Sequence, residues 1–392
     1  MIMKYKIEKL GNLVELKQGL AINSQSNYLV SEVETSLSLL RIADMPTKRK
    51  VIFMSEKTPS RYIANRDDII YTRTGQVGLV FTGQEGVVHN NCFRVNSLNE
   101  KVLLNKYLYW VLKSKYLYTL ANTYAAGAAQ PDLPHTSFKK IKIPLPDINL
   151  QQKIANILSR YDEAIENNNK RIKLLEQMAQ NLYKEWFVRF RFPGYENCEF
   201  ENGIPVGWKY KNLFDVVNVT YGYAFASELF CDDESLNPVV RIRDILDNYT
   251  KTFTSEECSD KYIIKENEIL IGMDGIFHMC MWNGGKAYQN QRVVKLTAKT
   301  EVYSNYFLFL AVQPQIKFWE QTIAGTTVAH LGDKHLKRIN VLIPSDDILK
   351  QATIKFNLLM KQKNSLFKAN KNLVKQRDLL LPRLMSGKLE VN

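Results

Sequence analysis

Two stretches of the chain carry apolar residues at alternating intervals of four and three positions, a spacing typical of a coiled-coil seam. In the second stretch the seam contains a leucine every seven residues, from Leu359 to Leu380. Asn168 fills the one polar position of the first seam. The first seam consists of Ile154, Leu158, Tyr161, Ile165, Ile172, Leu175, Ala179, Leu182 and Trp186.

Each stretch predicts one long helix. Pro193 and Gly194 follow the first stretch, and Pro382 and Gly387 are expected to end the second. At ~1.5 Å per residue, some 40 residues make a rod of about 60 Å. A stripe this narrow favours antiparallel pairing of the two helices, which would hold the rest of the chain apart at a fixed distance. The alternative is two unrelated surface helices, each packed on its own domain.

A globular part with short β-rich runs precedes each helix. Gly, Asn and Asp separate the runs, which lie at 69–71, 79–81, 269–271 and 293–294. Both globular parts close on an alternating strand pattern, IKIPLP from Ile141 and INVLIP from Ile339, and the proline ends the strand. We therefore predict an α+β fold with two similar globular domains at 1–147 and 193–345. The helices take 148–192, as a central spacer, and 346–392.

The two halves of the chain repeat one another. LRIAD at Leu40 recurs as VRIRD at Val240, and DIIYTRTG at Asp68 recurs as EILIGMDG at Glu268. The offset stays between 198 and 203 over more than 120 residues, which chance matches do not sustain. Further matched pairs are Gly19 with Gly222, Asn90 with Asn290, Gly127 with Gly325, Leu133 with Leu331, and Pro146 with Pro344.

The charge balance favours a polyanionic partner. The chain of 392 residues has 53 Lys and Arg against 40 Asp and Glu, a formal net charge of +13. The second helical stretch is the most basic part, with ten Lys and Arg against three Asp and Glu from Asp347 to Asn392. These side chains could follow phosphates, or could form a solvated face that keeps a long helix soluble.

Motifs for catalysis are missing. The chain has no phosphate-binding glycine loop, no nuclease pattern and no complete methyltransferase tetrad, of which Asn237-Pro238 is the nearest trace. Five scattered cysteines form no C-x-x-C pair, and no run approaches the ~18 apolar residues of a membrane helix. We interpret the pairs His330/His335 and His278/Cys280 as ordinary polar residues. These absences predict a binding protein from a reducing compartment, with no catalytic residue and no metal.

Side chains able to read base edges are concentrated in equivalent loops of the two copies. Arg pairs with guanine and Asn or Gln with adenine, each through two hydrogen bonds. An Asn or Thr beside a Gly is also common in turns, so each position has a purely structural alternative. The first copy offers Lys17, Gln18, Arg41, Arg73, Thr74, His89, Asn90, Asn91 and Gln130. The second offers Tyr221, Arg241, Arg243, Asp274, His278, Gln289, Asn290, Gln291, Arg292, Thr326 and Thr327.

Over its whole length the chain resembles the specificity subunits of Type I restriction–modification enzymes. The resemblance is carried by AGAAQPDLPHTSFKKIKIPLP at Ala126, QQKIANIL at Gln151, WFVRFRFPG at Trp186, IPVGW at Ile204 and RDLLLPRLMSGKL at Arg377. The chain departs from the pattern where Tyr5 aligns with Trp208, where Val328 aligns with Gln130, and after Pro344, which no Gln-rich helix start follows.

The resemblance implies two target recognition domains, each reading one half of a two-part site in double-stranded DNA. The paired helices would set the gap and dock two modification subunits, which methylate adenine with S-adenosylmethionine. Restriction subunits, with ATP and Mg²⁺, would join later. The chain itself would bind no cofactor, no metal and no membrane, and would work in a prokaryotic cytoplasm. An enzyme with its own methyltransferase or nuclease activity, and a protein scaffold built on the coiled coil, are the competing hypotheses.

Overall fold

The chain folds into two units, each built from discontinuous segments. The computed structural model describes residues 5–127, 130–323 and 329–389. The first unit contains Met1–Glu166 and Lys371–Asn392, and the second contains Asn167–Asn370. The unit boundary falls within both long helices, so each unit holds one globular domain and a part of both helices.

The described residues of the first unit form three sheets. The four-stranded sheet has the order β2 (Val14–Gln18), β10 (Cys92–Ser97), β7 (Ile69–Thr72) and β8 (Val80–Phe81), all antiparallel. The five-stranded sheet has the order β3 (Val30–Ser31), β5 (Phe53–Met54), β4 (Leu37–Leu40), β9 (Gly86–Val88) and β6 (Ile63–Ala64). A two-stranded sheet pairs β1 (Lys6–Lys9) with β11 (Lys142–Leu145). The shorter helices are α1 (Asn105–Lys113), α2 (Lys115–Tyr124) and α3 (His135–Lys140).

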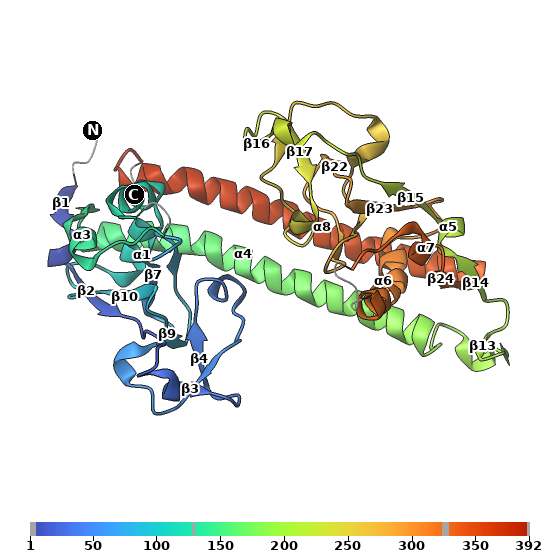
Figure 1. Cartoon of the computed structure of the whole chain (residues 1–392), viewed down its shortest axis with the longest axis horizontal. Helices are drawn as coiled ribbons and strands as arrows, with labels where there is room; N and C mark the ends of the chain where they lie inside the picture. Colours follow the sequence, from blue (N-terminus) through green and yellow to red (C-terminus); the bar gives the residue numbers. More distant parts are fainter. Residues whose placement is uncertain (1–4, 128–129, 324–328, 390–392) are drawn as a thin grey trace. The chain divides into compact units, whose positions relative to one another are not determined.

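The second unit repeats this topology (Figure 1). Its four-stranded sheet has the order β15 (Val217–Tyr221), β23 (Val293–Ala298), β20 (Ile269–Gly272) and β21 (Met279–Met281). Its five-stranded sheet has the order β16 (Phe230–Cys231), β18 (Phe253–Thr254), β17 (Asn237–Val240), β22 (Ala287–Gln289) and β19 (Ile263–Ile264). The strand β14 (Lys209–Asn212) pairs with β24 (Asn340–Ile343), and β12 (Phe200–Glu201) pairs with β13 (Ile204–Pro205). The shorter helices are α5 (Leu213–Val216), α6 (Asn305–Ile323) and α7 (Asp333–Leu336).

The internal repeat is therefore confirmed at the level of strand pairing. Each five-stranded sheet contains one parallel pair, β4 with β9 in the first unit and β17 with β22 in the second. The registers also agree, because Lys9 faces Lys142 where Asn212 faces Asn340. The closing strands predicted from IKIPLP and INVLIP are β11 and β24.

Both long helices are present, and their C-terminal ends differ from the prediction. The first, α4 (Ile148–Tyr183), continues as a π-helical turn to Val188, and the second, α8, spans Asp346–Met385. Of the two residues predicted to end α8, Gly387 follows the helix with a φ of 70°, whereas the prediction for Pro382 is wrong, because this proline lies inside the last turn. A proline so near the end removes one hydrogen bond, while the neighbouring Leu381 and Leu384 stay packed in the core.

The two helices pair in opposite directions within each unit. In the second unit the Asn168 amide donates to Asn370 Oδ1 at 2.9 Å, and Lys363 Nζ lies 2.7 Å from Glu176 Oε1. In the first unit Arg377 pairs with Asp162. Residue numbers thus rise along α4 while those of the partner fall along α8, as an antiparallel pair requires.

Each domain core also includes parts of both helices. In the first unit Ile154 and Leu158 of α4 share a cluster with Leu384 of α8 and with Phe93 of β10. In the second unit Ala179 of α4 shares a cluster with Phe356 and Met360 of α8. The alternative of two unrelated helices, each on its own domain, does not describe this packing. Within the described ranges we find no helix long and apolar enough to span a bilayer.

Candidate nucleic-acid interface

A close backbone approach shapes the same loop in both units. Beyond β2 and β15 the chain passes a neighbouring loop so tightly that a Cβ on Gly19 would lie 2.2 Å from the His89 carbonyl oxygen. A Cβ on Gly222 would lie 1.9 Å from the Asn290 carbonyl oxygen. The matched glycines of the repeat are therefore required for contact between two loops that carry predicted site residues.

In the first unit this approach gathers five of those residues into one hydrogen-bonded cluster. Arg73 Nη1 donates to Gln18 Oε1 at 3.1 Å, and Gln18 Nε2 donates to the Asn90 carbonyl at 2.6 Å. The backbone amides of Arg73 and Thr74 both donate to the Asn91 carbonyl, at 2.8 and 3.2 Å. The cluster lies where β7 ends and β10 begins.

Asp132 completes the first cluster and was missed by the sequence prediction. Its carboxylate accepts hydrogen bonds from Arg73 Nε at 3.1 Å, from Arg73 Nη2 at 2.5 Å and from Thr74 Oγ1 at 2.6 Å. The hydrogen bond from Arg73 holds the pKa of Asp132 below its usual value, so this carboxylate is charged at neutral pH. The available signal was its position one residue before Leu133, the matched partner of Leu331.

In the second unit the equivalent cluster has a different chemistry. Asp274 Oδ1 lies 2.6 Å from His330 Nδ1, and its Oδ2 lies 3.4 Å from Arg292 Nε. Nearby, the Tyr221 hydroxyl donates to Asp333 at 2.7 Å. Burial and this acidic partner raise the pKa of Tyr221, which keeps the phenol protonated.

The backbone around the two clusters is the same although the side chains differ. Leu133 N donates to the Arg73 carbonyl at 2.9 Å, and Leu331 N donates to the Met273 carbonyl at 2.7 Å. One frame therefore presents different polar groups in each unit. This combination suits two binding surfaces of one origin and different specificity.

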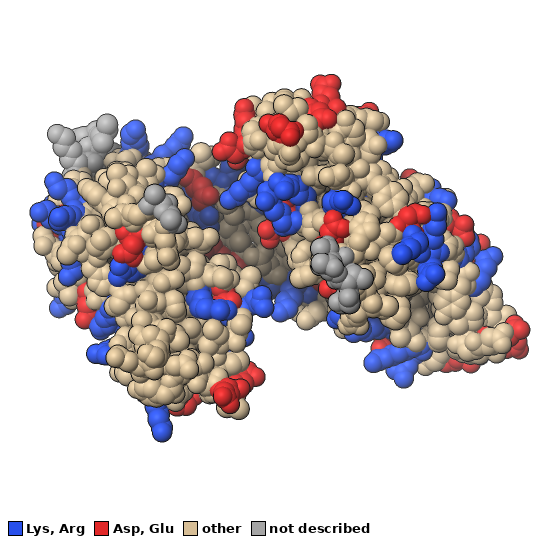
Figure 2. All heavy atoms as spheres, viewed as in Figure 1, with Lys and Arg blue, Asp and Glu red and all other residues tan. Residues whose placement is uncertain are grey.

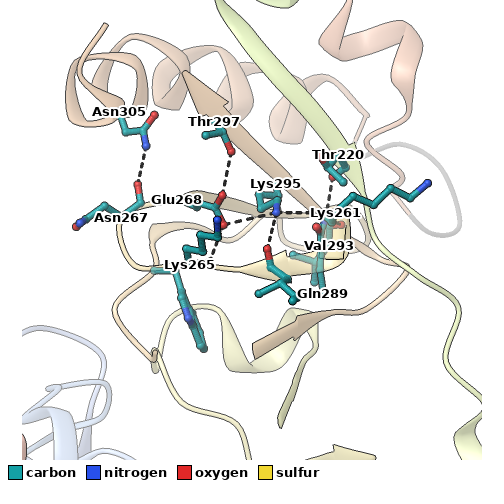
Figure 3. A network of polar contacts seen from close by, with 12 residues as sticks. Thr220, Lys261, Lys265, Asn267, Glu268, Gln289, Val293, Lys295, Thr297 and Asn305 are labelled. Atoms are coloured by element: carbon teal, nitrogen blue, oxygen red, sulfur yellow. Dashed lines mark hydrogen bonds and ion pairs between the residues drawn. The ribbon is translucent and has the colours of Figure 1, made fainter. Parts of the chain in front are cut away.

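A buried ion pair supports the strands behind each cluster. In the first unit Arg94 Nη1 lies 3.0 Å from Asp68 Oδ2; in the second, Lys295 Nζ lies 3.6 Å from Glu268 Oε2. Burial opposes ionisation of Asp68, but hydrogen bonds from the Asn65 amide, Asn96 and Arg94 outweigh it and hold the pKa below its usual value. Figure 3 shows the second pair, where Lys295 also donates to the carbonyls of Lys261 and Ile263 at 3.1 and 2.6 Å.

Gln289 does not fit its predicted role as a base reader. The side chain is fully buried, and its amide donates to the carbonyls of Thr220 and Val293, both at 2.7 Å (Figure 3). Both amide hydrogens are therefore committed to backbone, and Gln289 joins β15 to β23. In the first unit His89, at the matched position, is half-buried, and burial followed by the charge of Arg41 lowers its pKa.

The remaining predicted residues lie around the two clusters with varied exposure. Gln130, Arg243 and Gln291 are exposed, and His278 lies half-exposed between β20 and β21. The cations have partners: Lys17 Nζ lies 2.9 Å from Glu15, Arg41 Nε lies 2.5 Å from Asp44, Arg241 lies over the Phe230 ring, and Arg243 Nη2 donates to Thr252 Oγ1 at 3.4 Å. Asn290 Oδ1 accepts from Gln291 N at 2.6 Å. Thr326 and Thr327 fall outside the described residues.

Charge excludes one part of the surface as a phosphate-binding face. Figure 2 shows Asp and Glu gathered over the tip of the second unit that carries β16 and β17. The loop between these strands contains Asp232, Asp233 and Glu234, all exposed. Phosphates would be repelled by these carboxylates.

The metal-ligating and nucleophilic side chains of the described residues are dispersed or buried. A search of 5–127, 130–323 and 329–389 finds no group of three or more His, Cys, Asp or Glu able to hold a metal. Burial raises the pKa of the Cys92 and Cys280 thiols to about 12, so neither is a ready nucleophile.

Comparison with known proteins identifies one family. The model described as "Type I restriction modification DNA specificity domain" matches residues 3–177 and again 205–376. The MjaIX specificity subunit of a Type I restriction enzyme from Methanocaldococcus jannaschii is 28% identical over 366 residues, covering 88% of this chain and 82% of that protein. The HindI specificity subunit from Haemophilus influenzae is 23% identical over 408 residues, covering 83% and 87%.

A solved structure shares the fold. The S subunit of a Type I restriction–modification system from M. genitalium aligns with a TM-score of 0.56 at 17% sequence identity, covering 99% of this chain and 97% of that one. Each domain match ends inside a long helix, at residue 177 in α4 and at residue 376 in α8, in agreement with the predicted order of two similar domains, each followed by a long helix.

Proposed function

Since the chain belongs to the family of Type I restriction–modification specificity subunits, with two target recognition domains, we propose that each domain reads one half of a two-part DNA site. The observation that carries this proposal is the repeated frame with unlike side chains. Arg73, Thr74 and Gln18 occupy it in the first unit, and Asp274 and Tyr221 occupy the matched positions in the second. Two readers of the same sequence would need no such difference.

The reading elements are the loops at the ends of β2, β7, β15 and β20. Exposed or half-exposed donors on the loops packed beside these strand ends, including Asn91, Gln130, Gln291 and Arg292, are the side chains that would meet base edges. One short site of this kind cannot single out a position in a genome, but two linked readers multiply their discrimination when the distance between them is right.

The paired helices set that distance in this proposal. Both α4 and α8 are continuous, and an ion pair joins them within each unit, Asp162 with Arg377 in the first and Glu176 with Lys363 in the second. A stiff pair of helices transmits spacing, whereas a flexible linker would permit many gaps.

The same helices offer a surface for partner subunits. Leu174 and Met178 of α4, with Ile354 and Leu358 of α8, expose more than half of their side-chain surface. In the second unit Leu174 and Met178 line a groove of about 360 Å³ with Leu366 and Gln362 of α8. Apolar residues at i and i+4 on an exposed helix are typical of a face that another helix covers. We assign this exposed apolar surface to a modification subunit, which would bind S-adenosylmethionine and methylate adenine. Restriction subunits with ATP and Mg²⁺ would then join the complex.

Selection of DNA by the assembled complex tests the proposal. The full chain is combined with the modification subunit from the same genome and with duplexes in which every base is random. The expected product is one sequence of two conserved halves separated by a gap of fixed length. A single uninterrupted motif, or no motif, would contradict the two-reader assignment.

The enzyme and scaffold alternatives are tested in the same preparation. The purified chain alone is incubated with DNA, Mg²⁺ and labelled S-adenosylmethionine, and is expected to transfer no methyl group and cut no strand. Turnover without a partner would favour the enzyme hypothesis. A complex that assembles but protects no DNA from nuclease would favour the scaffold.

A further inference from the structure

Each unit joins its reading loop to its four-stranded sheet through one carboxylate. In one unit this carboxylate belongs to the loop, and in the other it belongs to the residue that follows the strand. Residue 74 forms an isolated bridge with Asp132, and the matched Asp274 forms the same bridge with His330. In the first unit the loop residue is the acid, while in the second unit the residue after the strand is the acid. The polarity of the junction is thus reversed between the two copies.

Asp132 fixes several predicted readers at once. It binds Arg73 through two nitrogens and Thr74 through its hydroxyl, and Arg73 in turn holds Gln18. The side chain of Arg73 keeps only 22% of its surface exposed, so its guanidinium is held in place by Asp132 and Gln18. A bidentate arginine–carboxylate pair sets orientation as well as position.

Asp274 does the equivalent work in the second unit with different partners. Its two oxygens face His330 from the loop and Arg292 from the position just before β23. Arg292 keeps 55% of its surface exposed, so Asp274 can orient its Nε while the rest of the guanidinium contacts a ligand.

A carboxylate at a surface that meets DNA requires an explanation, because it repels the phosphates nearby. Both units nevertheless place one at the same junction, and in both every carboxylate oxygen is directed to a protein partner. We infer that Asp132 and Asp274 are positioning residues for half-site specificity, each orienting the readers of its own unit without contacting a base. This inference rests on the proposed function.

The reversed polarity has a direct consequence for exchange between the units. Moving the first loop onto the second frame would place Asp132 against Asp274, two like charges at contact distance. Moving the second loop onto the first would place His330 against Thr74 and leave Arg73 without its acid. Each loop therefore works only with its own sheet.

Single neutralising variants test the inference in the assembled complex with fully random duplexes. We expect Asp132→Asn to reduce discrimination in the first half-site by about tenfold at one or more positions, the scale of losing one well-oriented arginine contact. We expect Asp274→Asn to do the same in the second half only. The double variant T74D/D132H restores a carboxylate from the other side of the first junction and should recover part of the lost discrimination.

The matched control is Glu85→Gln, which removes an exposed carboxylate of the first unit that pairs with Arg66 at the surface. It should leave both half-sites unchanged. If wild type selects a two-part sequence and Asp132→Asn selects the same first half, the positioning role is refuted. If Asp132→Asn weakens both halves equally, its role is general stability, which also refutes it. If wild type itself selects no two-part sequence, the proposed function fails, independently of the variants.

Discussion

Replacing Gly222 by alanine tests the close approach that shapes the second reading loop. The new Cβ would lie 1.9 Å from the Asn290 carbonyl oxygen, whereas real Cβ atoms keep at least 3.0 Å, so the two loops must separate by about 1.1 Å. That movement strains the hydrogen bonds from Gly222 N to Val293 O, 3.1 Å, and from Tyr223 N to Gln289 O, 2.9 Å.

The expected loss follows from these contacts. Two weakened hydrogen bonds at roughly 1 kcal/mol each, with overpacking of about 1–3 kcal/mol, give a loss of about 3 kcal/mol in the free energy of unfolding. For a unit of this size, about 2–4 °C per kcal/mol lowers the melting temperature by roughly 6–12 °C. Differential scanning calorimetry of the full chain measures the shift, and selection of random duplexes should show weakened reading of the second half-site only.

Gly19→Ala is the parallel variant in the first unit, and a milder one, because its Cβ would lie 2.2 Å from the carbonyl oxygen that it approaches. Gly332→Ala is the matched control. It has φ of −86°, and its nearest neighbour would lie at 3.6 Å, an ordinary contact. We expect the control to stay within about 0.5 kcal/mol of wild type. A Gly222→Ala protein that melts within 2 °C of wild type, on the order of 0.5 kcal/mol, would refute the reasoning.

Three further predictions concern the frame, the readers and the helices. Asp68→Asn leaves Arg94 without its buried partner and should cost roughly 3 kcal/mol at pH 7 in urea unfolding. The pKa of Asp68 is lower in the folded chain than in the unfolded chain, so its carboxylate stabilises the fold above the unfolded pKa near 4, and this stabilisation is lost as pH falls through the folded pKa. The free energy of unfolding of the variant should therefore depend less on pH below about pH 4. A pH dependence equal to that of wild type would exclude this role. Gln289→Leu should lower stability and leave the second half-site intact, while Gln291→Ala should alter that half-site and leave stability intact; the opposite result would restore Gln289 as a reader. Matched insertions of four residues beside Asn168 and Asn370 should lengthen the selected gap by one or two base pairs, since four residues add about 6 Å of helix, and an unchanged gap would show that the helices do not set it.

The sequence was sufficient to predict features that depend on spacing. The seven-residue leucine pattern predicted α8, and the constant offset between copies predicted the repeated strand order, because both follow from periodicity along the chain. The matched glycines Gly19 and Gly222 were visible as a pair, but the carbonyl groups that require them were not. Their partners, His89 and Asn290, lie some 70 residues away in sequence.

Features that depend on three-dimensional contact were missed for a physical reason. Gln289 has the side chain of a base reader, and only the fold shows that Thr220 and Val293 take both of its amide hydrogens. Asp132 has the wrong charge for a DNA surface, and only its partners Arg73 and Thr74 explain it. Residue type indicates what a side chain can bind, whereas the neighbours decide what it does bind.

The repeat separates what the frame must keep from what specificity can change. Behind the loops, Asp68 with Arg94 becomes Glu268 with Lys295, so the chemical identities differ while the order of acid and base is the same. At the loop junction the order itself is reversed, with Asp132 acidic in one copy and His330 basic in the other. A buried pair constrains charge order because an unpaired buried charge is costly, and both strands would have to change together. A partly exposed junction is constrained less, since solvent screens part of the repulsion in a mismatched arrangement. The side chains of the reading loops can therefore change while the buried pairs of the frame keep their order of charges. They differ at the loops where two different half-sites would require different side chains.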